Sequence, residues 1–270
     1  MTDLLARRER FAVVGSTNDV VRGWLAHGTP EVCLAVAAEQ TTGRGREGRS
    51  WVAPAGAALL LSLGFRPSWL APEHVWRLAA VVTLAMAEAA ESIAGLAAGV
   101  ICLKWPNDLV IADPDGVRKL AGILGETDGL GGPDPRAVIG IGLNTDWPAT
   151  AFPSDLAPSM TSLREMTGDR PIDHDALLDA FIDRLAIAIE GLRGGRFDET
   201  GWADRQLTTG RWIDVVAPDG SVASVRALGV DVASGALVVA DREAPGGSRQ
   251  VIVGEIRHVR LAQPAIRAGV

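Results

Sequence analysis

Tyrosine is absent from the 270 residues, and cysteine occurs only twice. Cys33 and Cys102 each lie within an apolar run, and neither has a Cys or His neighbour at metal-ligand spacing. This pattern favours two buried thiols in a reducing cytosol over a disulfide framework or a zinc site. Tryptophan, in contrast, occurs eight times. We therefore expect chemistry that uses neither a metal–thiolate centre nor a disulfide.

Long hydrophobic runs are absent as well. The most apolar long segment, residues 78–87, covers about half of a membrane span. The first fifteen residues, MTDLLARRERFAVVG, carry charges where a signal peptide has its apolar stretch. We expect a soluble, cytoplasmic protein.

Positive charge is in deficit, with 26 Lys and Arg against 33 Asp and Glu and a net charge of −7. Such a surface repels nucleic acid and anionic membranes, so any anion site must be local. The hydrophobic fraction of 47% and the charged fraction of 22% indicate an ordinary globular protein. A chain of this length holds one large domain, or one large and one small domain.

Two common catalytic signatures are missing: the phosphate loop G-x-x-x-x-G-K-[ST] and the nucleophile elbow G-x-S-x-G. The four histidines have no motif around them, and no metal-ligand cluster is visible.

Hydrophobic patterning predicts a mixed α/β domain over residues 1–204. Thr17 or Asn18 caps a first helix that Gly28 ends, Pro72 opens a long helix to about residue 94, and Asp173 caps a helix that ends at Gly194. Buried strands are expected at residues 32–38, 57–65, 100–104, 109–111, 119–125 and 137–143.

The pattern changes after residue 205. Short β-branched runs alternate with turns and no helix is expected, which is typical of a small barrel. We therefore predict a second, all-β domain over residues 205–270.

Residues 43–49 read GRGREGR. Glycines let the backbone approach a ligand closely, and arginines are planar donors for phosphate or carboxylate. The stretch also satisfies G-x-G-x-x-G, but no helix start follows, which disfavours a dinucleotide site. A solvated basic loop is the plain alternative.

Three further segments carry polar groups beside apolar strands. In KWPND, residues 104–108, a lysine suits phosphate and Asp108 could hold Mg²⁺ or orient an amine, although a structural turn explains the segment equally well. In KLAGILG, residues 119–125, Lys119 opens a strand. In VIGIGLN, residues 138–144, Gly140 and Gly142 share one face of the sheet and leave room for a flat ligand or a crossing helix.

Near the start, Gly15-Ser16-Thr17-Asn18 can cap a helix, and its hydroxyls and amide could equally read a polar ring. Gln40 precedes the basic loop and offers both a donor and an acceptor.

Taken together and in this order, the motifs resemble those of the biotin protein ligases: STN, E-x-x-x-G-R-G-R-x-G-R-x-W, KWPND, KLAGIL and G-I-G-x-N. The match runs from about residue 13 to 146, and Gly254-Glu255-Ile256 in the β-rich tail is similar to the family's C-terminal barrel. The resemblance implies an α+β fold: a mixed sheet with helices, like that of class II aminoacyl-tRNA synthetases, plus a small SH3-like barrel.

The resemblance also implies an activity. ATP and Mg²⁺ would convert biotin to biotinyl-5'-AMP, and biotin would pass to a lysine of a biotin carboxyl carrier domain. Catalytic roles fall on Lys119, Arg46 and Asp108, with Asp108 also the candidate Mg²⁺ ligand. The implied biotin-binding residues are Ser16, Thr17, Asn18, Gln40, Gly43, Arg44, Trp51, Lys119, Gly122, Gly140 and Gly142. The implied ATP- and phosphate-binding residues are Arg44, Arg46, Arg49, Lys104, Trp105, Asn107, Asn144, Glu255 and Arg260.

Two departures from the family pattern stand out. Residues 109–118, which link KWPND to KLAGIL, are longer than in short members, and we interpret them as a grown hairpin around Asp113-Pro-Asp-Gly116. Only 15 residues precede Ser16, so we expect the ligase-only form without an N-terminal helix-turn-helix domain and without specific DNA binding.

Two alternatives stay open. A lipoate or octanoate ligase shares a related fold but uses a different Gly/Arg signature and, in the transferases, a catalytic cysteine. A non-enzymatic nucleic-acid-binding regulator would use the basic loop and the barrel, against the net acidity of the chain.

Overall fold

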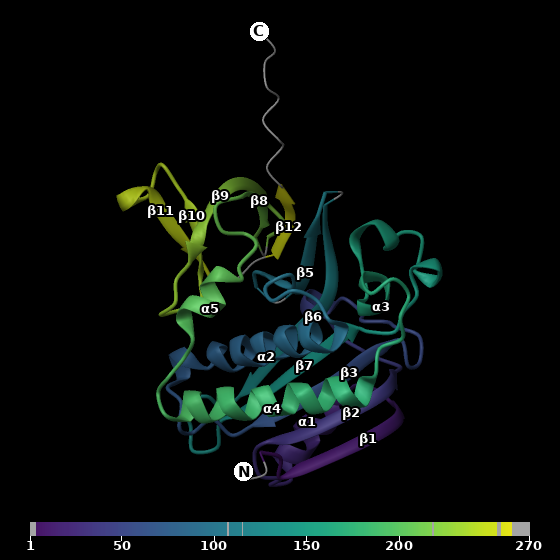
Figure 1. Ribbon diagram of the computed structural model, residues 1–270. Helices are drawn as coiled ribbons and strands as arrows, with labels where there is room; N and C mark the ends of the chain where they lie inside the picture. Colours follow the sequence, from purple (N-terminus) through teal and green to yellow (C-terminus); the bar gives the residue numbers. More distant parts are fainter. Residues whose placement is uncertain (1–3, 107, 115, 218, 253–254, 261–270) are drawn as a thin grey trace.

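A computed structural model describes residues 4–106, 108–114, 116–217 and 219–252, together with the backbone of residues 255–260. It contains two sheets, a seven-stranded mixed sheet and a five-stranded antiparallel sheet near the C-terminus (Figure 1). The strands of the first sheet are β1 (Arg7–Val14), β2 (Cys33–Gln40), β3 (Ala58–Phe65), β4 (Cys102–Lys104), β5 (Asp108–Asp113), β6 (Gly116–Asp128) and β7 (Arg136–Asn144).

The seven strands follow the order β1-β2-β3-β7-β6-β5-β4. β1 runs parallel to β2, and the other neighbours are antiparallel. Every strand predicted in the first domain is present. β5 and β6 join through a hairpin in which Asp113 pairs with Gly116, as the inserted turn predicted.

Strand β1 was not predicted. Its sequence, RRERFAVV, lies at the edge of the sheet, and most of its side chains are exposed. Arg8 and Arg10 form ion pairs with Asp179 and Asp175. An edge strand needs no continuous apolar pattern, so these charges concealed it.

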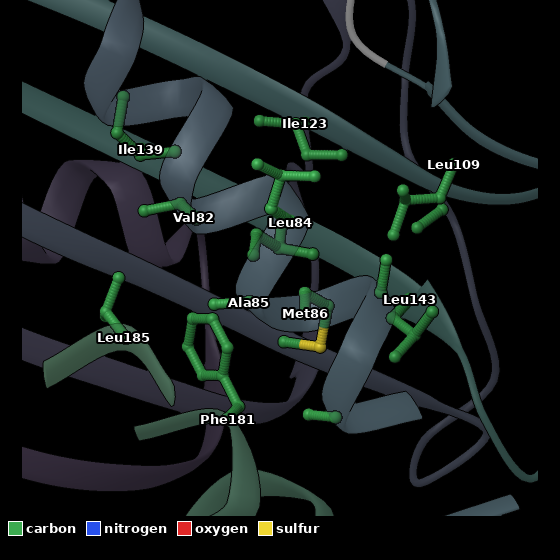
Figure 2. Close-up of a cluster of buried hydrophobic side chains, with 14 of the residues drawn as sticks. Val82, Leu84, Ala85, Met86, Leu109, Ile123, Ile139, Leu143, Phe181 and Leu185 are labelled. Carbon is green, nitrogen blue, oxygen red and sulfur yellow. The ribbon is translucent and has the colours of Figure 1, made fainter. Parts of the chain in front are cut away.

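Two long helices, α2 (Trp76–Ala94) and α4 (His174–Arg193), pack against each other on one face of the sheet. Figure 2 shows Met86 and Val82 of α2, Phe181 and Leu185 of α4, and strand residues such as Ile139 gathered in one buried cluster. α2 ends at Gly95 in the left-handed conformation, and the Asp173 side chain caps α4 as predicted. This apolar core holds β6 and β7 in place, the two strands that carry the KLAGILG and VIGIGLN motifs.

Helix α1 (Thr17–Ala26) covers the opposite face of the sheet. Its Val21 and Leu25 pack with Cys33 and Ala35 of β2, whereas Leu34 and Val36 of the same strand belong to the core under α2. The cap residue is Ser16 rather than Thr17 or Asn18, and both of those lie in the first turn of the helix. The consequence is that Thr17 and Asn18 are buried against the sheet.

Two short helices, α3 (Leu163–Met166) and α5 (Glu199–Asp204), lie in the connections, and α5 leads to the second sheet. That sheet has the order β11-β10-β9-β8-β12, which confirms the predicted all-β unit. Its strands are β8 (Trp212–Val216), β9 (Val222–Val230), β10 (Leu237–Ala240), β11 (Ser248–Val251) and β12 (Glu255–Arg260). The boundary at residue 204/205 stays a prediction.

Among the described helices, none combines the length and the apolar character needed to cross a membrane.

Candidate active site

The polar motifs meet at a cavity of about 380 Å³ on the α1 face of the sheet. It is lined from three directions, by the start of α1, by the Gly/Arg loop and by strands β6 and β7. The predicted site residues that line it are Ser16, Thr17, Asn18, Gln40, Arg44, Arg46, Arg49, Trp51, Asp108, Lys119, Gly122, Gly140, Gly142 and Asn144. Segments that are far apart in the sequence therefore form one site, since Ser16 and Asn144 border the same space.

One end of this cavity is a hydrogen-bonded polar cluster. Gln40 Oε1 accepts from the Thr17 backbone N–H at 2.7 Å and from the Thr17 hydroxyl at 3.0 Å. Ser62 Oγ lies 2.7 Å from Thr17 Oγ1 and 2.5 Å from Asn18 Oδ1. The Asn18 amide donates to Glu126 at 2.6 Å. With its oxygen occupied, the group that Gln40 can still offer a ligand is its amide NH₂.

The glycine stripe holds two side chains in close contact. A Cβ added to Gly140 would overlap the Asn18 amide, and one added to Gly142 would overlap the Trp51 indole. At Gly122 an added Cβ would lie 2.9 Å from the Trp51 ring. The stripe was expected to be an open floor for a ligand, but these glycines first make room for Asn18 and Trp51. They define the wall of the cavity by letting those side chains lie flat on the sheet.

The Gly/Arg loop is a small hairpin. Gly45 N–H donates to Arg49 O at 2.7 Å, and Trp51 N–H donates to Gly43 O at 2.9 Å. A Cβ at Gly43 would overlap the Trp51 carbonyl, so glycine is required at this crossing. Arg46 opens a short 3₁₀ turn, Arg46–Gly48, whose middle residue has φ of 57°.

The guanidinium of Arg44 does not project into the cavity as a free phosphate donor. It forms two 2.7 Å hydrogen bonds to Asp19 of α1. Hydrogen bonding to Arg44 and the positive charge of its guanidinium hold the pKa of Asp19 below its usual range. Hydrogen bonding to Asp19 and its negative charge raise the pKa of Arg44. The side chain of Arg44 therefore ties the loop to α1, and its predicted biotin- and phosphate-binding role stays a prediction.

Lys119 and Asp108 form an ion pair, with Lys119 Nζ 2.6 Å from Asp108 Oδ1. Lys119 Nζ also lies 5.5 Å from the centre of the Trp51 ring. The two residues come from adjacent strands, since β5 pairs with β6 through Asp108 and Gly122. The positive charge of Lys119 is therefore held near the Trp51 ring, in the cavity that the Gly/Arg loop also lines.

A second, larger cavity of about 910 Å³ lies between the first sheet and the C-terminal sheet. Lys104 and Trp105 line this cavity and not the smaller one. The two cavities share a wall composed of Arg44, Gly45, Arg46, Asp108, Ile123 and Leu124. Of the predicted phosphate residues, Lys104 and Trp105 therefore line only the larger cavity, Arg49 and Asn144 line only the smaller one, and Arg44 and Arg46 lie in the shared wall.

Three predicted site residues cannot be placed. Asn107 lies outside the described residues. Glu255 and Arg260 belong to β12, but their side chains also lie outside the described part of the chain. Asn144 is placed: its amide donates to Thr161 O at 2.9 Å, so it braces the segment that closes one side of the smaller cavity.

Several residues of the site were missed. Ser62 and Glu126 complete the polar cluster, but each lies in an apolar or unremarkable strand sequence, and only the fold brings them beside α1. Trp147, Leu156 and Met160 line the smaller cavity from the connection after β7. The apolar character of this connection was a usable signal, but it has no motif.

Neither cysteine has the features of a nucleophile. Burial raises the pKa of the Cys33 thiol to about 11. Cys102 is half-buried rather than fully buried, and burial raises its pKa as well. Both groups are therefore protonated thiols at neutral pH.

Among the described residues, no group of three or more His, Cys, Asp or Glu side chains is arranged to hold a metal ion. Asp108, the candidate Mg²⁺ ligand, is already ion-paired with Lys119. These residues therefore do not fit a metal centre that the protein would build by itself.

Comparisons with known proteins show the family of the chain. Residues 11–144 match the biotin/lipoate A/B protein ligase family. The biotin–[acetyl-CoA-carboxylase] ligase of Mycobacterium tuberculosis is 30% identical over 92% of this chain and 88% of its own length. The bifunctional ligase/repressor BirA of Bacillus spizizenii is 31% identical over 58% of this chain, but this match spans only 46% of that relative.

A solved structure has the same fold. The biotin protein ligase from Aquifex aeolicus in complex with biotin and ATP superposes with a TM-score of 0.75 at 23% identity, over 95% of this chain and 99% of that one.

Proposed function

The chain belongs to the biotin protein ligases, and we propose from that premise that it activates biotin with ATP to biotinyl-5'-AMP and transfers the biotin to a lysine of a biotin carboxyl carrier domain. One observation carries the proposal. A single cavity has the uncharged side chains of Thr17, Asn18 and Gln40 at one end and Lys119 with the arginine loop beside it. Biotin has the matching polarity, with a neutral ureido ring at one end and a carboxylate at the other.

The polar cluster supports biotin over lipoate. Thr17, Asn18 and Gln40 present hydroxyl and amide groups that are buried or half-buried. Thr17 and Asn18 are already hydrogen-bonded within the cluster, so the Gln40 amide NH₂ is the donor left for a ligand. A ureido oxygen accepts from this amide, whereas an apolar dithiolane would leave it without a partner, at a cost of about 1–3 kcal/mol. Discrimination against lipoate therefore follows from the ring end of the cavity.

The first half-reaction needs concentrated positive charge. A biotin carboxylate oxygen attacks the α-phosphorus of ATP, pyrophosphate leaves, and two anions must first be brought together. Arg46, Arg49 and Lys119 line the smaller cavity and supply this charge in a partly enclosed space, where it acts more strongly than in water. We assign Lys119 to the developing charge on the α-phosphate.

The second half-reaction takes place at the wall between the two cavities. The acceptor amine attacks the acyl carbon and AMP leaves, so the acyl carbon must be reachable from the larger cavity. Asp108 belongs to both cavities and to the Lys119 ion pair. A free lysine has a pKa of about 10.4, so its amine must lose a proton, and we assign Asp108 to orient that amine and accept the proton.

No step is assigned to a metal ion held by protein side chains, because the described residues hold no group of three or more His, Cys, Asp or Glu side chains placed to bind one. A divalent ion that arrives with the phosphates of ATP is part of the substrate.

The alternatives receive less support. Two protonated, non-nucleophilic thiols disfavour a transferase with a catalytic cysteine. The same reduced thiols fit the cytoplasm as the location of this activity.

The test is biotin-dependent exchange of radiolabelled pyrophosphate into ATP, which reports the first half-reaction without an acceptor protein. We expect exchange with biotin and none with lipoate. Exchange with lipoate alone would overturn the assignment.

A further inference from the structure

A residue of the KWPND motif completes the core of the C-terminal sheet. Trp105 is 4% exposed and packs among apolar residues of that sheet, namely Ile213, Val215, Ala227, Leu237, Val239 and Val251. Its indole N–H donates to Gly235 O at 3.0 Å, in the turn between β9 and β10. Its contact with ATP stays a prediction: Trp105 lines the larger cavity, while its ring packs against the second sheet.

Gly235 also packs closely against the first domain, at Trp76 of α2. It has φ of +73°, and an added Cβ would lie 2.7 Å from the ring of Trp76 in α2. The Trp76 ring in turn lies 4.8 Å from that of Trp202 in α5, centroid to centroid. The turn that accepts the Trp105 hydrogen bond is therefore seated on α2, so it cannot shift without losing both contacts.

The main chain beside Trp105 is fastened to the connection between the sheets. Leu103 N–H donates to Arg205 O, and Leu207 N–H donates to Leu103 O, each at 2.8 Å. Arg205 also forms two hydrogen bonds, of 2.9 and 3.0 Å, to the buried carboxylate of Glu91 in α2. Strand β4 is thus held along one edge by residues 205–207, which precede the second sheet, and along the other edge by β5.

The neighbours of Trp105 in sequence belong to the reaction site. Lys104 and Asp108 line the larger cavity, and Asp108 pairs with Lys119. Because Trp105 lies between them, the position of the C-terminal sheet sets the position of this short segment. A shift of the C-terminal sheet would move Lys104 and the Asp108 carboxylate together.

We propose that Trp105 is a positioning residue which couples the seating of the C-terminal sheet to the nucleotide side of the active site. This inference rests on the proposed ligase function. In this role Trp105 acts through Lys104 and Asp108, its neighbours in the KWPND motif. The polar cluster that reads the biotin ring is built from α1, β2 and β3, and it is independent of this contact.

The test uses the full chain with Trp105→Phe, which keeps an aromatic ring but removes the N–H donor. We expect the KM for ATP in pyrophosphate exchange to rise about 2- to 10-fold, as one lost hydrogen bond allows, with the biotin dissociation constant unchanged. Hydrogen–deuterium exchange should increase in peptides covering residues 99–106 and 232–237, and not in β2 or β3. Trp212→Phe is the matched control, since this tryptophan of β8 is 52% exposed and should change neither constant.

Gly235→Ala changes the residue whose carbonyl accepts the Trp105 hydrogen bond. It should likewise raise the KM for ATP and leave the biotin dissociation constant unchanged. An unchanged KM for ATP in both variants would overturn the inference, as would a parallel rise in the biotin dissociation constant. Unchanged deuterium exchange at residues 99–106 would overturn it even if the protein proved inactive. Absence of exchange activity in the wild-type protein with biotin would instead refute the proposed function.

Discussion

Lys119 and Arg46 are two cations of one site, but they are held in place by different parts of the structure. Lys119 is anchored in β6 and paired with Asp108, whereas Arg46 lies at the tip of the Gly/Arg hairpin. We assign Lys119 to forming the adenylate and Arg46 mainly to retaining it, because a contact from the tip forms only over a bound anion. A charge-assisted hydrogen bond contributes about 1.5–3 kcal/mol, or roughly 10- to 150-fold in release.

Lys119→Ala should therefore abolish biotinyl-AMP synthesis, and Arg46→Gly should still make the adenylate but release it. Each variant is mixed with an unrelated lysine-rich protein, biotin and ATP, and biotin is detected by blotting. We expect diffuse labelling with Arg46→Gly and none with Lys119→Ala. The reverse pattern, or silence from both, would exclude this division.

Gly142 tests the contact between the sheet and Trp51. Gly142→Ala places a methyl group inside the Trp51 indole, so the ring must move from the cavity wall. We expect biotin affinity to fall about 10-fold or more, a loss of at least about 1.4 kcal/mol, measured by calorimetric titration. Gly23→Ala in α1 is the control, because an added Cβ there meets nothing within 4 Å. Equal affinity in the two variants would show that Trp51 does not shape the biotin site.

At the scale of elements, the sequence predicted what depends on local pattern. The buried strands and the three longer helices follow from apolar runs and from signals such as Gly28 and Asp173. Pro72 opens a 3₁₀ turn just before α2, which itself begins at Trp76. β1 was missed because an exposed edge strand carries charges in place of an apolar pattern. Ser62 was missed for another reason: its partners Thr17 and Asn18 reach it only because α1 crosses β3.

Near the start of α4 lies a half-buried histidine, His174, which contacts the residue that follows β7. His174 Nε2 lies 2.6 Å from Thr145 Oγ1, and burial lowers the His174 pKa from 6.5, against the opposing carboxylates of Asp146, Asp175 and Asp173. Arg10 also lowers this pKa. A depressed histidine pKa means that the folded state binds fewer protons than the unfolded state. The stability contribution is present above pH 6.5 and is lost as the pH falls below it.

His174→Gln should flatten this dependence. We expect the wild-type protein to lose stability between pH 7 and about pH 5 more steeply than the variant, by about 1.4 kcal/mol for each unit of pKa depression. Urea unfolding at several pH values measures the difference, with His74→Gln as the control. Parallel profiles for wild type and His174→Gln would contradict this role.

For the whole molecule, the junction between the sheets determines how the chain tolerates truncation. Residues 205–207 hold β4, and Arg205 is the ion-pair partner of Glu91, which is 3% exposed. A chain ending at residue 204 leaves that carboxylate without its cation, which costs up to about 3–5 kcal/mol. A chain ending at residue 208 keeps the pair. Both chains lose the C-terminal sheet that covers Trp105.

We therefore expect the 1–208 chain to unfold at a higher temperature than the 1–204 chain, to bind biotin and to fail in adenylation. Calorimetry and pyrophosphate exchange measure these properties. Arg205→Ala in the full chain should reproduce the stability loss of the shorter truncation. Equal unfolding temperatures for the two truncations would show that Arg205 contributes little.

The sequence motifs predicted the composition of the site better than its arrangement. Fourteen predicted residues line one cavity, since each motif lies at a strand end or helix start that the fold brings together. The directions of Arg44 and Trp105 were not predictable, because Asp19 and the second sheet, which attract them, have no signal in those motifs.

Because tyrosine is absent, the ultraviolet fluorescence of this protein comes from its tryptophans without a tyrosine contribution. Trp51 and Trp147 line the smaller cavity, whereas Trp76, Trp105 and Trp202 line the larger one. A ligand that displaces or covers the Trp51 ring changes the polarity around that fluorophore, so each cavity contains its own spectroscopic reporter and occupancy can be followed without a label.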